Sequence, residues 1–265
     1  MSPGLQGLVD LTVDGCINIL TLTRPEARNA LSAELCNAIV DGLAEIERRD
    51  DARVVLLQGA GSVFCSGADF AAVSGPGGID FLPAFERMLE TLGRFRLPVV
   101  AAIQGAALGG GLQLATACDF RIAVDDAKIG IPSSRLGIVV NYENVRRLVL
   151  LVGIAVAKEV LMTGRVYTGR EAQEAGLITR AVPEGPLFEE ARELCERLAA
   201  NAPLSVQGAK RSIEVVADDL SDARQRDPAA VAEVDRLVMQ AYESADLAEG
   251  IAAMTEKRPP RFEGR

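Results

Sequence analysis

The sequence contains no histidine and no tryptophan among its 265 residues. Without an imidazole, the Ser/His/Asp and Cys/His nucleophilic systems are excluded, and so is any mechanism that needs a histidine base. Proton transfer, if the protein catalyses any, must be carried by carboxylates, tyrosine, lysine or the backbone.

Long apolar runs and a surplus of basic residues are missing as well. No stretch approaches the ~20 apolar residues that a membrane span requires, and the N-terminus has neither the basic start nor the apolar core of an export signal. The formal net charge of −9 opposes a nucleic-acid partner, whose phosphates need a basic surface. We therefore expect a cytoplasmic protein with no membrane span and no nucleic-acid partner.

Cysteines are few, odd in number and without metal-binding spacing. They are Cys16, Cys36, Cys65, Cys118 and Cys195. None forms a CxxC pair, and most lie in apolar segments, so we expect reduced thiols, no disulfide framework and no metal site.

The order of the predicted elements indicates an α/β fold. Residues 54–57 and 99–103 are short apolar runs, typical of parallel strands that are covered on both faces. Ser32 precedes a segment with apolar residues at helical spacing and is its expected N-cap. From about residue 201 the pattern is helical throughout, so we divide the chain into a core at 1–200 and a helical segment at 201–265.

Both of these predicted strands end in Gln-Gly and lead into glycine-containing loops. One loop runs from Gly59 to Asp69, and the other runs from Gly105 to the glycines at 109–111. A strand, a glycine turn and a helix start leave unpaired N–H groups at the carboxyl end of a sheet. Two such ends side by side predict a site for a developing negative charge. We also expect residues 74–78, which contain glycine and proline together, to form a loop that can flex over a pocket, and its closure over a ligand is not fixed by the sequence.

Four segments in order carry a resemblance to a known family. They are RPEARNAL at 24–31, FCSGAD at 64–69, PVVAAIQG and the following glycines up to CD at 98–119, and LMTG with its continuation at 161–177. Together they resemble the four motifs of the enoyl-CoA hydratase/isomerase (crotonase) family. The spacing matches over roughly residues 7–200, and the tail at 257–262 is also similar to the family's C-terminal end.

The resemblance implies a crotonase (ClpP-like) spiral of ββα units with a helical C-terminal trimerisation segment. It also implies acyl-CoA ligands, with coenzyme A as part of the substrate and no separate cofactor, and a homo-oligomer, either a trimer or a dimer of trimers. The family's oxyanion hole falls on the backbone N–H groups of Ala68 and Gly110. Both residues lie at glycine-rich helix starts, where backbone donors are free and the helix dipole favours an anion, so the residues themselves agree with this pair.

Further positions follow from the resemblance as substrate or CoA contacts. They are Arg24, Ala27, Arg28, Ser66, Gly67, Asp69, Phe70, Gly109 and Lys257. Where the family often has a lysine two residues after the Ala-Asp pair, this sequence has Ala71, so one phosphate contact is missing. Arg24, Arg28 and the basic pair at 257–258 are the candidates to replace it.

The acidic positions of the family are all uncharged here. The hydratase glutamates correspond to Gln113 and Ser133, and an aspartate of some isomerases and dehalogenases corresponds to Asn141. An amide does not titrate near neutral pH, and a lone serine hydroxyl is a poor acid or base. Glu86, which shares a face of a predicted helix with Glu90, and Glu143, just beyond the third of these positions, are the candidates to replace them.

Three hypotheses remain open at this point. The chain is an enzyme of the hydratase or isomerase kind with non-standard acid/base groups, a non-catalytic acyl-CoA carrier or regulator, or a member with another crotonase chemistry, such as decarboxylation or thioester hydrolysis. Family membership favours an enzyme, while the missing glutamates make standard hydration doubtful. Acyl chain length, pathway and trimer against hexamer are not fixed by the sequence.

Overall fold

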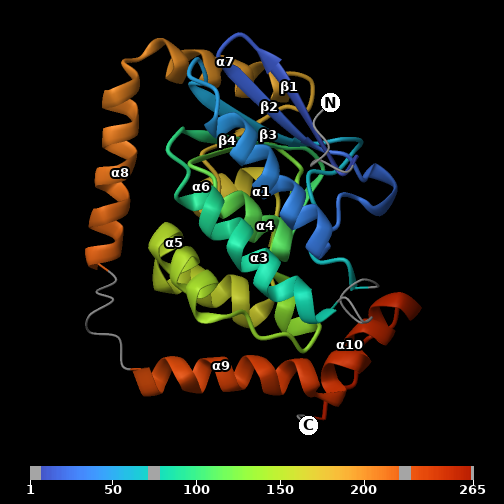
Figure 1. Cartoon of the computed structure of the whole chain (residues 1–265). Helices are drawn as coiled ribbons and strands as arrows, with labels where there is room; N and C mark the ends of the chain where they lie inside the picture. Colours follow the sequence, from blue (N-terminus) through green and yellow to red (C-terminus); the bar gives the residue numbers. More distant parts are fainter. Residues whose placement is uncertain (1–6, 71–77, 221–227, 264–265) are drawn as a thin grey trace. The chain divides into compact units, whose positions relative to one another are not determined.

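The computed structural model describes residues 7–70, 78–220 and 228–263 (Figure 1). By their internal contacts these residues divide into two compact units, one comprising 1–129 and 167–213 and the other 130–166 and 214–265. We call them unit 1 and unit 2. These units differ from the division into a core at 1–200 and a helical segment at 201–265 that the sequence predicts. That functional division stays a prediction. The loop expected at 74–78 lies outside the described residues, except for Gly78, where helix α3 begins.

A six-stranded sheet forms the centre of unit 1, in the order β1-β2-β3-β4-β6-β9. Its strands are β1 (Val9–Asp14), β2 (Ile17–Leu22), β3 (Val54–Gly59), β4 (Val99–Ile103), β6 (Phe120–Val124) and β9 (Arg180–Val182). The first two form an antiparallel hairpin around Asp14-Gly15, a dipeptide typical of tight hairpins, and every later pair is parallel. Strands β3 and β4 are buried almost throughout, as their continuous apolar runs predict. A smaller sheet has the order β5 (Ala106–Leu108), β7 (Lys128–Gly130) and β8 (Val166–Tyr167).

Helices cover this sheet with narrow apolar stripes. Helix α1 (Ala33–Glu47) and α3 (Gly78–Gly93) pack side by side, and α7 (Leu187–Ala200) packs on β3 and β4 (Figure 1). Ser32 caps α1 as predicted, since its side chain accepts a hydrogen bond from the N–H of Leu35 at 3.3 Å. Fully buried leucine, isoleucine and methionine side chains from α1 and α3 contribute roughly 1.5–3 kcal/mol each.

Helix α7 has no counterpart among the predicted elements. Its buried residues, Leu187, Ala191 and Cys195, recur every four positions. The many glutamates and arginines between them make this apolar face difficult to detect in the sequence. Two further helices of unit 1 are short: α4 (Gly110–Thr116) and α6 (Gly169–Glu174), the latter with a capping box at Thr168.

Unit 2 is mainly helical. It contains α5 (Tyr142–Thr163), α9 (Pro228–Glu243) and α10 (Ala245–Glu256), and α8 (Pro203–Leu220) runs from unit 1 into it. In the sequence, residues 144–151 and 155–161 each have a helical pattern, which predicts two helices. A break at Gly153, whose φ of 75° and ψ of 169° are not helical, confirms this division. Two short 3-10 helices, Pro25–Ala27 in unit 1 and Pro132–Arg135 in unit 2, complete the fold.

None of the described helices is both long enough and apolar enough to cross a membrane.

Candidate functional site

Ala68 is held in place by Leu31 in a single parallel bridge. The N–H of Leu31 donates to the carbonyl of Gly67 at 2.7 Å, and the carbonyl of Leu31 accepts from the N–H of Asp69 at 2.8 Å. In a parallel bridge of this kind, the residue between the two bonded neighbours directs its own N–H and C=O away from the partner strand. The N–H of Ala68 is therefore turned away from Leu31.

Gly110 is the first residue of α4, where backbone N–H groups have no partner inside the helix. The preceding Gly109 has a φ of 55° and no side chain, so nothing caps this helix start. An anion near such a helix start is favoured by the local backbone dipoles.

The two loops that carry Ala68 and Gly110 pack directly against each other. The backbone N–H of Cys65 donates to the carbonyl of Ala106 at 3.0 Å. The backbone carbonyl of Cys65 accepts from the N–H of Leu108 at 3.1 Å. A Cβ placed on Gly67 would lie 2.8 Å from the carbonyl oxygen of Leu108 and 3.5 Å from the nitrogen of Gly110. Gly67, with a φ of 108°, thus allows a close approach that no side chain permits.

These contacts bring two free donors to one place. Within residues 7–70, 78–220 and 228–263, the N–H groups of Ala68 and Gly110 have no hydrogen-bond acceptor. A buried or half-buried N–H without a partner costs free energy, and a ligand oxygen would remove that cost. The arrangement can therefore bind a carbonyl oxygen and stabilise the negative charge that develops on it.

The surroundings of Gly110 are apolar. A Cβ at this position would lie 3.3 Å from Cδ1 of Leu31 and 3.5 Å from the ring of Phe85, and both of these side chains are buried. The Phe85 ring stacks on Phe81, with the ring centroids 5.4 Å apart. A low dielectric strengthens the hydrogen bonds that the two N–H groups would make.

Gln113 lies on α4, one turn beyond Gly110, and is half-buried. Its backbone N–H donates to the carbonyl of Gly109 at 3.1 Å. Its side-chain amide makes no hydrogen bond to the described residues. The amide is thus available to a ligand or a water, but it supplies neither an acid nor a base.

Glu86 is exposed on α3, next in sequence to the buried Phe85. Glu90, one turn further, pairs with Arg94 at 3.5 Å on the exposed side of the same helix. The structure therefore places these carboxylates on the solvent side of α3. Because Glu86 is exposed, its position does not support the expectation that it replaces the missing glutamates.

Arg24 and Asp69 form an ion pair with a distance of 2.9 Å from Nη2 to Oδ2. Arg24 also donates to the carbonyl of Ala30 at 2.7 Å. Both side chains are about four-fifths buried, so the pair ties the loop at 24–31 to the loop that contains Ala68. Arg24 is thereby occupied as a structural cation.

The loop at 24–31 carries further predicted contacts. The carbonyl of Arg28 accepts from the N–H of Ser66 at 3.1 Å, so these two positions lie together. Arg28 is exposed, with a φ of 53°, and its guanidinium has no ion-pair partner among the described residues. Ala27 ends a 3-10 helix and is half-buried, as is Phe70 on the other loop.

Three of the predicted acid/base positions belong to unit 2, and each makes contacts within that unit. Ser133 is buried in the 3-10 helix Pro132–Arg135, and its backbone carbonyl accepts from the N–H groups of Leu136 and Ile138 at 3.0 Å. Asn141 is the N-cap of α5, where its Oδ1 accepts from the N–H of Asn144 at 3.1 Å. The exposed Glu143 forms an ion pair with Arg146 at 3.1 Å.

Lys257 ends helix α10 in unit 2, with a φ of 54°. Its exposed ammonium has no ion pair within the described part of the chain. By contrast, the neighbouring Arg258 is bound by the carboxylates of Glu249 and Glu256 at 2.6 Å each, which removes it from the candidates for a phosphate contact.

Burial makes four of the five thiols inert. It raises the pKa of Cys36, Cys65, Cys118 and Cys195 to about 12. All five cysteines are free. Among the described residues, no three cysteine or acidic side chains lie close enough to hold a metal ion.

Two residues with structural roles were not predicted. Leu31, which holds Ala68, lies within a recognised segment, but only the backbone geometry reveals its role. Arg121 is 5% exposed and donates to the carbonyls of Cys118 at 2.6 Å and Leu177 at 3.0 Å. It therefore fixes the C-terminal end of the segment that begins at Gly110, and no local sequence signal marks it.

The chain is similar to known proteins over nearly its whole length. A sequence model of the family described as enoyl-CoA hydratase/isomerase matches residues 12–265. Enoyl-CoA hydratase EchA19 of Mycobacterium tuberculosis is 33% identical over 261 residues, which cover 93% of each chain.

Solved structures are similar as well. An enoyl-CoA hydratase/isomerase of Pseudoalteromonas atlantica superposes with a TM-score of 0.83 at 31% identity, over 97% of this chain and all of the other. A methylmalonyl-CoA decarboxylase bound to 2S-carboxypropyl CoA superposes with a TM-score of 0.87 at 21% identity, over 97% of this chain and 98% of the other, which shows a shared fold.

Proposed function

Because the chain belongs to the enoyl-CoA hydratase/isomerase family and has the crotonase fold, we propose that it binds fatty acyl-CoA thioesters at the N–H groups of Ala68 and Gly110. The observation that carries this proposal is the pair of unpaired backbone donors on two loops packed against each other. The thioester carbonyl oxygen accepts from both N–H groups, with the acyl part beside the apolar surface formed by Leu31 and Phe85.

Polarisation of the carbonyl is the chemical consequence of this binding. As electron density moves onto the oxygen, the thioester becomes enolate-like, and each well-placed donor lowers the barrier by roughly 3 kcal/mol. Hydration of a 2-enoyl thioester needs this stabilisation together with a base for the water and an acid for the α-carbon.

The acid/base part of hydration is weak in this chain. Gln113 and Ser133 stand where the family's hydratases have glutamates, and neither titrates near neutral pH. A general acid or base contributes about 10² to 10⁴ in rate, so we propose tight thioester binding with hydration far below that of a hydratase that has both glutamates. The physiological role is then that of an acyl-CoA carrier or regulator.

Decarboxylation is the second candidate function, because it needs the N–H donors of Ala68 and Gly110 but does not need the two missing glutamates. When the bond between an α-carbon and its carboxylate breaks, CO₂ leaves and the electron pair becomes the enolate held by Ala68 and Gly110. No base is required for that step, and a proton from water completes the reaction. The decarboxylase with the same fold shows only that the scaffold accommodates this chemistry.

A paired experiment tests the proposal. Calorimetry with a medium-chain 2-enoyl-CoA measures binding, and the decay of its conjugated absorbance measures hydration in the same sample. The proposal expects saturable binding with little loss of absorbance. Failure to bind would refute it, and rapid loss of absorbance would show that other groups replace the glutamates, with Glu86 and Glu143 to be tested first.

We also propose that the protein is a homo-oligomer in the cytoplasm, a trimer or a dimer of trimers built through residues 201–265. Large apolar side chains on α8 support this proposal, because Leu204, Ile213 and Leu220 are all more than two-thirds exposed. Sedimentation of the full chain measures the mass of the particle in solution, and we expect the mass of a trimer or a hexamer. A monomer alone would contradict the proposal.

A further inference from the structure

The residue that follows Ala68 in the chain, Asp69, carries a carboxylate. Consecutive Cα atoms are ~3.8 Å apart, so this charge lies well inside the ~10 Å over which exposed charges interact in dilute salt solution. The side chain is about four-fifths buried, which leaves its charge less screened than a charge on the surface. Its sign is unfavourable for the site, because it opposes the negative charge that develops on a carbonyl oxygen bound at the N–H of Ala68.

The guanidinium of Arg24 offsets this carboxylate. Its Nη2 lies 2.9 Å from Oδ2 of Asp69, and its Nη1 donates to the carbonyl of Ala30 at 2.7 Å. Ala30 directly precedes Leu31, whose two backbone hydrogen bonds hold the segment that contains Ala68. One cation thus binds both segments of this bridge, the side chain of one and the backbone of the other.

Asn29 fixes the backbone from which the Arg24 side chain extends. Its Oδ1 accepts from the N–H of Arg24 at 3.0 Å, and its own N–H donates to the carbonyl of Arg24 at 2.8 Å. Its Nδ2 donates to the carbonyls of Ala60 at 3.0 Å and Val63 at 2.7 Å, and the residue is fully buried. A cation held in this way is preorganised, so it does not have to reorient when a negative charge develops nearby.

A second carboxylate, that of Glu34, belongs to the same group of charges. Its pKa is lowered, chiefly by the hydrogen bond from the hydroxyl of Ser32 and in part by the positive charge of Arg24, while the negative charge of Asp69 opposes the lowering. Glu34 is exposed in the first turn of α1 and does not adjoin either N–H group of the site. It is therefore a control carboxylate near the same arginine.

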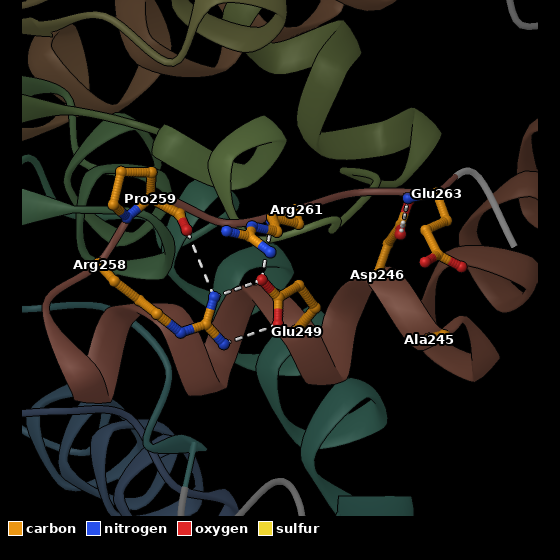
Figure 2. Close-up of a pocket in the computed structure, with 7 residues that line it drawn as sticks. All are labelled: Ala245, Asp246, Glu249, Arg258, Pro259, Arg261 and Glu263. Atoms are coloured by element: carbon orange, nitrogen blue, oxygen red, sulfur yellow. Dashed lines mark hydrogen bonds and ion pairs between the residues drawn. The ribbon is translucent and has the colours of Figure 1, made fainter.

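An arginine–carboxylate pair elsewhere in the chain has a different setting. Figure 2 shows Glu249 of unit 2 between Arg258 and Arg261, and both of its carboxylate oxygens accept from Arg258. Its Oε1 also accepts from the backbone N–H of Arg261 at 2.7 Å, so the carboxylate itself uses the backbone donor beside it. Beside Asp69, in contrast, the N–H of Ala68 has no acceptor within residues 7–70, 78–220 and 228–263 and is available to a ligand.

We propose that Arg24 is a positioning residue for the N–H donor of Ala68. By binding the carboxylate of Asp69, it holds the segment that carries this N–H and offsets the negative charge next to it. The N–H is then able to stabilise negative charge on a carbonyl oxygen. The inference rests on the proposed function, because it needs a thioester carbonyl bound at Ala68 and Gly110. It gives Arg24 a role other than the phosphate contact expected from the sequence.

The experiment measures the polarisation of a bound carbonyl in full-length variants. Each variant is saturated with a medium-chain 2-enoyl-CoA, so that the shift of the conjugated absorbance band is compared per bound ligand, and calorimetry gives the dissociation constant. We expect Arg24→Gln to lose most of the shift and to bind roughly tenfold more weakly, because Asp69 keeps its charge without a counter-ion.

Removal of the carboxylate as well should restore the site. We expect Arg24→Gln combined with Asp69→Asn to regain the wild-type shift and to bind within about twofold of wild type, since neither charge remains. Arg24→Lys keeps the charge without the forked geometry and should retain more of the shift than Arg24→Gln. Glu34→Gln should change the affinity less than about twofold and leave the shift unchanged.

The double variant separates the proposal from two simpler roles of Arg24. If the arginine only held the loops together, or if it bound the ligand directly, the double variant would be at least as weak as Arg24→Gln. Asp69→Asn alone keeps the proposal testable if Arg24→Gln does not fold. It leaves the cation in place, so we expect a shift at least as large as that of wild type.

Three results would overturn the inference. They are an unchanged shift in Arg24→Gln, a double variant as weak as Arg24→Gln, or loss of the shift in Asp69→Asn. The proposed function fails separately, through a wild type that does not bind the ligand or binds it without any shift, and the inference fails with it.

Discussion

Gly111 and the carbonyl oxygen of Cys65 are in such close contact that a Cβ at Gly111 would overlap that oxygen. The same oxygen accepts the hydrogen bond from the N–H of Leu108, so it cannot move without opening the contact between the two loops. The glycine triplet thus has two different roles. Gly111 allows the loops to meet, while Gly110 contributes an N–H group to the site.

Gly111→Ala is expected to destabilise the protein much more than Gly110→Ala. The first places a methyl group against backbone atoms, which costs about 1–3 kcal/mol, whereas the second meets the flexible end of Leu31 at 3.3 Å. Urea unfolding of both variants measures the difference. Equal free energies of unfolding would show that the loops do not meet as described.

Gln113→Glu combined with Ser133→Glu is expected to raise the hydration of 2-enoyl-CoA by at least about 10², because it restores a titrating group at both positions. The matched control is Gln113→Met with Ser133→Ala, which changes the same positions without adding carboxylates. The decay of conjugated absorbance gives the rates. If the double glutamate variant is no faster than wild type, the missing carboxylates do not explain weak hydration.

Local signals made the capping residues predictable. Ser32 and Thr168 lie next to the backbone groups that they satisfy, so a few consecutive residues contain all the information. The approach of the loops at Ala68 and Gly110 could also be anticipated, because the carboxyl ends of parallel strands meet at one edge of a sheet. That a thioester binds there stays a prediction.

Contacts between distant residues were not predictable in the same way. Arg24 and Asp69 are 45 positions apart, and in the sequence each has the pattern of an ordinary charged surface residue. Their ion pair becomes evident only in the folded structure. Arg121 binds only carbonyl oxygens, which every residue has, so its sequence context gives no signal. The ion pair between Glu249 and Arg258 follows a left-handed reversal at Lys257, which a lysine does not normally indicate.

Arg121→Leu is expected to lower the free energy of unfolding by about 2–4 kcal/mol. It leaves the carbonyls of Cys118 and Leu177 without their buried donor, and this loss outweighs the relief of no longer burying a charge. The control is Arg94→Leu, which removes an exposed arginine and its pair with Glu90 and should cost under about 0.5 kcal/mol. Equal effects in denaturant titration would contradict the role of Arg121.

Thiol labelling at pH 8 should modify Cys16 rapidly and the other four cysteines only after unfolding. The four have a pKa of about 12 because they are buried, so their thiolate fraction at pH 8 is near 10⁻⁴. Counting reactive thiols with and without denaturant tests this. Rapid reaction of more than one thiol in the native protein would be inconsistent with the packing described.

The same thiols set the sign of a pH effect. Their pKa is raised in the folded state above the ordinary value of 9.0, so their contribution to stability is fully present below pH 9. It declines between pH 9 and about 12 by up to about 1.4 kcal/mol per pH unit for each thiol. Cys65→Ala should therefore show a shallower decline than wild type in urea titrations at pH 8 and pH 10. An identical decline would contradict burial as the cause.

The central claim is that the N–H of Gly110 holds the thioester carbonyl. Gly110→Pro removes this single donor at the first position of a helix, where proline is tolerated, and Gly110→Ala adds a side chain but keeps the donor. The most direct measurement is the absorbance of bound 2-enoyl-CoA, whose conjugated band shifts to longer wavelength when its carbonyl is polarised. We predict that the shift persists in Gly110→Ala and is largely lost in Gly110→Pro, with binding weakened about three- to tenfold. An unchanged shift and unchanged affinity in Gly110→Pro would contradict the account.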